Sequence, residues 1–185
     1  MTAGGTGDGP LAWNVAGLLA DEPGVDRVYA VEDVRIDLGE DLVLHAPIAG
    51  RVRLLRTNRG ILASASLGTA LALECSRCLR AISFPVDVRL EEEYLPALDL
   101  TTGRPLPTDD EPDVSRLTDH HELDLETPVR EAIQLAEPIA PLCRPDCPGL
   151  CVVCGERLDD GVHDHPDDDI DPRLEALRGF TVDDT

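Results

Sequence analysis

Six cysteines in two clusters constrain this chain more than any other feature of its sequence. Cys75 and Cys78 form one C-x-x-C motif, and the other four lie within residues 143–154. Two thiolates at C-x-x-C spacing can point at one centre, and a glycine after the pair, as at Gly155, makes room for the turn. The spacing predicts a structural Zn²⁺ site in a reducing compartment, where metal binding is favoured over disulfides. The candidate ligands are Cys75, Cys78, Cys143, Cys147, Cys151 and Cys154.

The spacing leaves open which four sulfurs bind the metal. In a self-contained arrangement, the four cysteines of residues 143–154 would complete a tetrahedral site by themselves. In a split arrangement, Cys75 and Cys78 would meet either the pair at 143 and 147 or the pair at 151 and 154. A split site would join segments on both sides of a long polar stretch. Redox-active thiols are a third interpretation, because Arg77 between two cysteines would lower a thiol pKa.

The charge of the chain is large and unevenly distributed. The formal net charge is −21, and all 16 basic residues are arginines. The acids gather after Leu90 and again after Gly155, whereas residues 50–90 are rich in arginine. A guanidinium suits phosphate because it donates two parallel hydrogen bonds, although such a negative total charge argues against a general nucleic-acid binder. The candidate RNA contacts are Arg51, Arg53, Arg56, Arg59, Arg77 and Arg80; alternatively, these side chains only occupy the solvent face of strands.

Alternating apolar residues predict an antiparallel β domain over residues 11–95. Strands are expected over 28–38, 41–55, 61–66, 69–75 and 82–94, with a hairpin turn at 57–60. Pro47 and Gly50 indicate a bend or bulge, and Gly68 a break. Residues 11–20 would dock on the core as a short strand, alone or followed by a helix, with Trp13 against the core. The fold class is α+β: an antiparallel meander, which could close into a barrel, with one main helix and a C-terminal Cys-rich zinc knuckle.

The rest of the chain divides by composition. Residues 1–10 are Gly-rich and expected to be disordered, and residues 96–123 form an acidic loop or insert that is too polar to bury much apolar surface. Residues 124–158 combine a helix, capped by Thr127 with Pro128 in its first turn, with the zinc-binding element. An acidic tail with a short helix occupies residues 159–185. The histidine pairs at 120 and 121 and at 163 and 165 are interpreted as solvated loop side chains.

The N-terminal segment has neither the basic start nor the apolar core of a signal peptide, and no stretch approaches the length of a membrane span. We therefore expect a cytoplasmic protein that has no membrane partner.

The order of these parts resembles the YceD family, the large ribosomal RNA subunit accumulation proteins of bacteria and plastids. The matching parts are residues 74–79 at a strand end, the acidic strand through 91–94, the helix at 124–135, the Cys-rich stretch 141–155 and residues 171–174. The Cys-rich stretch is similar to that of many Gram-positive members. Val152 stands where a proline is expected, which does not affect ligation.

The resemblance implies a role in the synthesis, processing or stability of large-subunit (23S) ribosomal RNA, and it implies no catalytic residues. The leading hypothesis is a non-enzymatic ribosome-biogenesis factor whose basic face contacts ribosomal RNA or a pre-ribosomal particle. The alternative is an acidic adaptor that binds a basic ribosomal protein without contacting RNA. A zinc hydrolase is disfavoured, because catalytic zinc usually carries histidine and a water. No small-molecule substrate is expected.

Overall fold

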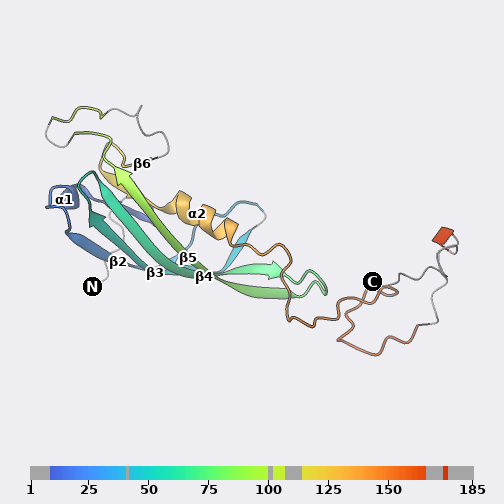
Figure 1. Cartoon of the computed structure of the whole chain (residues 1–185). Coiled ribbons are helices and arrows are strands. Elements are labelled where there is room, and N and C mark those ends of the chain that lie inside the picture. Colours follow the sequence, from blue (N-terminus) through green and yellow to red (C-terminus); the bar gives the residue numbers. More distant parts are fainter. Residues whose placement is uncertain (1–8, 41, 100–101, 107–113, 166–172, 175–185) are drawn as a thin grey trace, which may run out of the picture.

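A long, twisted β-sheet forms the body of the molecule (Figure 1). The computed structural model describes residues 9–40, 42–99, 102–106, 114–165 and 173–174. The strand order is β2-β3-β4-β5-β6; the first four strands are antiparallel, and β6 pairs in parallel with β5. The bounds are β2 (Asp26–Val34), β3 (Val43–Arg56), β4 (Ile61–Glu74), β5 (Ala81–Leu95) and β6 (Ser115–Arg116).

The sheet is open in the part of the chain that the structure describes. Its outer strands, β2 and β6, do not pair with each other. The α+β class and the antiparallel strands are therefore confirmed, whereas closure into a barrel is wrong. The physical reason is that the apolar face of the sheet packs against an N-terminal segment and a helix, so the sheet need not curl onto itself to bury that face.

The strands alternate between a buried and an exposed face, as the period of two requires. Val52 pairs with Ala65 on the buried side, and the neighbouring register position pairs Arg51 with Ser66 on the exposed side. Arg89 continues the exposed row on β5. This alternation gives the middle of the sheet one apolar face and one polar face.

The N-terminal segment and the main helix complete the core. The segment contains β1 (Ala12–Asn14) and α1 (Ala16–Leu19), which confirms a strand followed by a helix over residues 11–20. β1 pairs with β7 (Glu122–Asp124) in a separate two-stranded sheet. α2 (Glu126–Leu135) lies along β5 and buries Val129 and Ile133 (Figure 1). Trp13 is buried in this core, as expected.

Two local predictions need correction. Gly68 does not break a strand: β4 is continuous, and Gly68 pairs with Asp87 in its ladder. Thr127 does not cap α2, which begins one residue earlier, and the backbone N–H of Glu126 instead donates to the Asp124 side chain at 2.8 Å. Between β3 and β4 the pairing register shifts near Pro47, so the predicted bulge is confirmed.

Several predicted segments lie partly or wholly outside the described residues. These are the disordered N-terminus at 1–10, of which only 9 and 10 are described, and most of the acidic tail from residue 166 onward. Within 96–123, the described residues include β6 and the start of β7. No helix in the described ranges is both long and apolar enough to cross a bilayer.

Candidate metal centre

Two segments far apart in sequence meet beyond the end of the sheet. The first is the loop between β4 and β5, residues 75–80, and the second follows α2, residues 141–165 (Figure 1). We call these two segments together the cysteine-rich element. The backbone N–H of Ser76 donates to the carbonyl of Pro141 at 2.8 Å, which ties the segments together at the entrance of the second one.

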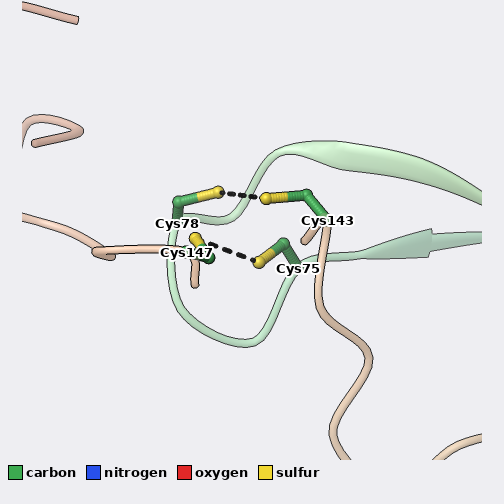
Figure 2. Close-up of side chains that lie close together, drawn as sticks. All are labelled: Cys75, Cys78, Cys143 and Cys147. Carbon is green, nitrogen blue, oxygen red and sulfur yellow. Dashed lines mark hydrogen bonds between the residues drawn. The ribbon is translucent and has the colours of Figure 1, made fainter. Parts of the chain in front are cut away.

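Four cysteine sulfurs converge where these segments meet. Figure 2 shows Cys75 and Cys78 from the β4–β5 loop facing Cys143 and Cys147 from the chain after α2. All four Sγ atoms lie within 4.8 Å of one another. We call these four residues the proximal group. The structure thus has the split arrangement in which Cys75 and Cys78 meet the pair at 143 and 147. The four cysteines of residues 143–154 do not form one group by themselves.

The distances in the proximal group fit a tetrahedral ion. Sγ of Cys75 lies 3.8 Å from Sγ of Cys147, and Sγ of Cys78 lies 3.7 Å from Sγ of Cys143. A tetrahedron with Zn–S bonds of about 2.3 Å has an S···S edge of about 3.8 Å. Cys75, Cys78 and Cys147 are each at most 1% exposed. The donor set and its spacing therefore suit Zn²⁺ and could hold it away from solvent.

The local backbone of the β4–β5 loop explains why the two sulfurs of its C-x-x-C motif point the same way. The N–H of Leu79 donates to the carbonyl of Cys75 at 2.9 Å, and the N–H of Cys75 donates to the carbonyl of Arg80 at 2.8 Å. Leu79 accordingly adopts a φ of +56°, which is uncommon for a residue with a side chain. The backbone conformation costs free energy, and such strain is typical of functional turns.

The environment of the sulfurs also favours a bound cation. Backbone hydrogen bonds from Cys143 and Cys78 lower the pKa of Cys75 to about 6, because they stabilise its thiolate. Burial raises the pKa of Cys143 to about 12 and also raises the pKa of Cys147. Without a cation, few of these thiols should therefore be ionised, because each further thiolate would bury a second negative charge beside the thiolate of Cys75. A divalent ion would remove this penalty by binding all four sulfurs.

The remaining two cysteines belong to a second group of side chains. Ligand atoms of Cys151, Cys154, His163 and His165 all lie within 4.8 Å of one another. We call these four residues the distal group. The sequence predicts that these two histidines are solvated loop side chains, whereas the structure places them beside the second C-x-x-C motif. The only signal in the sequence was an H-x-H pair following that motif closely.

The six arginines proposed as RNA contacts do not form one surface. Arg51 and Arg53 lie on the exposed face of β3, at the middle of the sheet. Arg77 and Arg80 lie in the loop between β4 and β5, at the far end of the sheet. Arg89 was not proposed, but it shares the exposed row with Arg51, and the alternation of β5 could have indicated it.

Five of the six side chains already contact protein groups. Three of them pair with carboxylates: Arg53 with Asp26 at 3.0 Å, Arg59 with Glu93 at 2.9 Å, and Arg80 with Asp160 at 3.4 Å. The other two donate to backbone carbonyls, Arg56 to Leu19 at 3.1 Å and Arg77 to Cys147 at 2.9 Å. Most of the basic charge between residues 50 and 90 is therefore neutralised or used in the fold.

Comparison with known proteins assigns the chain to a family. The sequence model described as large ribosomal RNA subunit accumulation protein YceD matches residues 63–181, from β4 to beyond both groups of candidate ligands. The chain belongs to the YceD family. The family's name supports a link to large-subunit ribosomal RNA, and the comparison assigns no catalytic residue.

Several mycobacterial proteins are similar to this YceD-family chain. Uncharacterized proteins of Mycobacterium tuberculosis and Mycobacterium bovis are 36% identical over 130 residues, which cover 68% of this chain and 58% of theirs. An uncharacterized protein of Mycobacterium leprae is 34% identical over 129 residues, covering 69% and 56% respectively. The matched region thus spans less than two thirds of the length of these relatives. No solved structure matches the chain significantly.

Proposed function

We propose that this protein is a non-enzymatic, cytoplasmic factor in ribosome biogenesis that supports the accumulation of large-subunit (23S) ribosomal RNA. Membership of the YceD family carries this proposal. In this proposal the proximal group holds a structural Zn²⁺. Four thiolates complete the tetrahedral coordination of zinc, so this ion has no open position for a water or a substrate. The metal therefore shapes a binding surface and does not perform chemistry.

The surface that contacts RNA is the exposed row at the middle of the sheet. Arg51 on β3 and Arg89 on β5 flank Ser66 on β4, and two strand spacings put the arginines about 10 Å apart. Both side chains are exposed, and neither forms an ion pair within the described ranges. They are free to donate to phosphate oxygens, whereas most of the other candidate arginines are already engaged.

Binding of the purified chain to large-subunit ribosomal RNA tests this surface. We compare the wild type with Arg51→Glu/Arg89→Glu at several salt concentrations. Loss of two phosphate contacts should weaken binding and reduce the slope of log K against log salt by about 1.4. A charge-matched control is Arg35→Glu/Arg104→Glu, which changes two exposed arginines outside the row. If the Arg51/Arg89 variant binds RNA and restores ribosomal RNA levels as well as this control, the sheet face is not the contact.

A specific observation favours the adaptor as a second candidate. Since five of the six proposed arginines already contact protein groups, the net charge of −21 leaves a surface dominated by carboxylates. Such a surface attracts a basic ribosomal protein and repels RNA. Capture of partners from ribosomal precursors, with and without nuclease digestion, separates the two candidates. A basic ribosomal protein that stays bound after the RNA is digested supports the adaptor.

A further inference from the structure

We propose that the distal group is a second Zn²⁺ site, separate from the proximal one, with Cys151, Cys154, His163 and His165 as its ligands. Two thiolates and two imidazoles form one of the common tetrahedral donor sets for zinc. The chain would then bind two ions, one by sulfur alone and one by sulfur and nitrogen. All four ligands come from a single stretch of the chain after α2, so this site would not join distant segments.

The first argument is that the backbone around Cys151 repeats the backbone around Cys75. The N–H of Gly155 donates to the carbonyl of Cys151 at 2.9 Å, which matches the bond from Leu79 to Cys75 at 2.9 Å. The N–H of Cys151 donates to the carbonyl of Glu156 at 2.7 Å, the counterpart of the bond from Cys75 to Arg80. The residue after each motif has a positive φ, +74° at Gly155 and +56° at Leu79.

Residues 75–80 and 151–156 are thus two copies of one turn. Each copy directs a pair of sulfurs at one centre. In the proximal group that centre is completed by two more sulfurs, and in the distal group it is completed by two histidines. The same two backbone hydrogen bonds and a positive φ also occur at Asp99, Gly103 and Arg104, so the turn alone does not mark a metal site. At residues 75–80 and 151–156 the turn carries two cysteines at C-x-x-C spacing, and this combination is what directs two sulfurs at one centre.

The second argument is the orientation of His163. Its Nε2 lies 3.0 Å from the carbonyl of Arg157, and a carbonyl can only accept, so Nε2 carries the proton. Nδ1 is then left with a free lone pair, and it lies 3.5 Å from Sγ of Cys154. A tetrahedral zinc ion with one sulfur and one nitrogen ligand sets an S···N edge of about 3.6 Å. A backbone carbonyl that fixes the tautomer of a metal-binding histidine is a recurring feature of zinc sites.

The third argument is an unsatisfied nitrogen. Nε2 of His165 is buried, and it has no hydrogen-bond partner among the described residues. A buried polar atom without a partner costs about 1–3 kcal/mol, so native proteins rarely leave one. Its ring centre lies 6.0 Å from that of His163, and its ligand atom lies within the same 4.8 Å group. An ion bound at Nε2 would supply the missing partner.

The surroundings of the distal group suggest what its ion would do. Nε of Arg157 donates to the carbonyl of Cys78 at 2.9 Å, and Arg80 of the proximal turn forms an ion pair with Asp160 at 3.4 Å. The turn that carries the distal ligands therefore rests against the proximal turn. Fixing that turn with an ion would hold Arg157 on the backbone of the proximal site. Cys154 is exposed and Cys151 is 7% exposed, so the distal ion would exchange with solvent faster than the proximal ion.

The zinc content of the full chain tests this proposal. The protein is purified under reducing conditions, loaded with Zn²⁺ and freed of loosely bound metal on a desalting column. We expect two zinc ions per chain in the wild type and one in His163→Asn/His165→Asn. The matched control is His45→Asn/His120→Asn, which removes two exposed histidines away from both groups and should keep two ions. Circular dichroism shows whether each variant keeps its sheet.

Cobalt substitution gives an independent measurement. The intensity of the thiolate-to-cobalt absorption per ion rises with the number of bound sulfurs, so titration of the wild type with Co²⁺ should show two steps of unequal intensity. The His163/His165 variant should keep the stronger step and lose the weaker one. One zinc ion per wild-type chain, or two ions retained in the variant, would overturn the second site. A wild type without any zinc would overturn the proximal site of the proposed function as well.

Discussion

The sheet body and the cysteine-rich element are stabilised by different interactions. The body contains a continuous aliphatic core, in which residues such as Ile48, Val52 and Leu54 are fully buried. The buried cluster of the element consists of Cys75, Cys78 and Cys147, with a few partly buried neighbours. Burial of apolar area offsets the loss of chain entropy in the body, and the element has too little apolar area for the same balance.

The surface of the element supports this difference. Val152 is 94% exposed, and Val153 and Leu142 are also exposed, although Val152 and Val153 lie between two candidate ligands and Leu142 directly precedes another. The chain here is placed by its sulfurs, hydrogen bonds and ion pairs, and apolar side chains point outward. If the proposed Zn²⁺ is bound, the element is a small structure that depends on the metal to fold, attached to a sheet that has its own apolar core.

Metal removal should have the largest effect, and it should affect the two regions unequally. Binding of a structural Zn²⁺ contributes about 10–16 kcal/mol, more than a typical whole domain retains as net stability. We expect a strong chelator to abolish protection from hydrogen exchange in residues 75–80 and 141–165. Amides of β3 and β4 at the middle of the sheet should keep their protection, because their core does not involve the metal.

Two outcomes decide this prediction. Re-addition of Zn²⁺ should restore protection in the element, which controls for irreversible oxidation of the thiols. Unchanged exchange after chelation, with metal loss verified by elemental analysis, would show that the element folds without an ion. Simultaneous loss of protection in β3 and β4 would show that the sheet body also depends on the metal.

A core substitution should produce the opposite pattern. Leu54 on β3 is fully buried, so Leu54→Ala should lower the free energy of unfolding of the body by about 2–5 kcal/mol. The zinc content of the folded variant should stay at the wild-type value, since Leu54 contacts neither group of ligands. Urea denaturation followed by circular dichroism, together with elemental analysis, measures both quantities.

Leu135→Ala is the matched control for Leu54→Ala. Leu135 ends α2 and is 87% exposed, so the same substitution there removes little buried area and should change stability by less than about 0.5 kcal/mol. Loss of zinc in the Leu54 variant would mean that the two regions fold as one cooperative unit.

The same difference between regions explains what the sequence could and could not predict. The strands of the body were predicted within a few residues, because burial on one face imposes a period of two on Val52, Ala65 and their neighbours. The predicted break at Gly68 was wrong, because Gly68 pairs with a residue of β3 on one side and of β5 on the other. These pairings hold the glycine in an extended strand. Thr127 has the chemistry of a cap, but the turn from β7 places Asp124 where the first helical N–H needs an acceptor.

The element was less predictable because its pairings are tertiary. The C-x-x-C spacing indicated a metal, but which sulfurs meet depends on where the chain returns after α2. That position is set by contacts such as Ser76 with Pro141, which no local pattern encodes. His163 and His165 were interpreted as solvated because their sequence neighbours are acidic. The two histidines lie beside Cys154 because the chain turns back between Leu150 and Arg157. Leu150 and Arg157 pair with each other across this turn.

The smallest expected effects come from two glycines that differ in their surroundings. Gly149 has a φ of +89°, and a Cβ added there would lie 3.3 Å from the carbonyl oxygen of Arg77 in the proximal turn. Gly155 has a φ of +74°, and an added Cβ would meet no atom within 4 Å. Alanine at either position pays about 1–2 kcal/mol for a left-handed conformation. Only Gly149→Ala also presses against the backbone that carries Cys78.

We therefore expect Gly149→Ala to weaken zinc retention more than Gly155→Ala, with both effects well below that of chelation. The measurement is competition with a chromogenic chelator, which follows release of each ion over time. Gly149→Ala should speed release from both groups, because it separates the two turns, whereas Gly155→Ala should act on the distal group alone. Equal effects on the proximal ion would show that the close approach of Gly149 to Arg77 does not support that site. The two turns would then be connected by the bond from Arg157 to Cys78 and by the Arg80–Asp160 ion pair, without a contribution from Gly149.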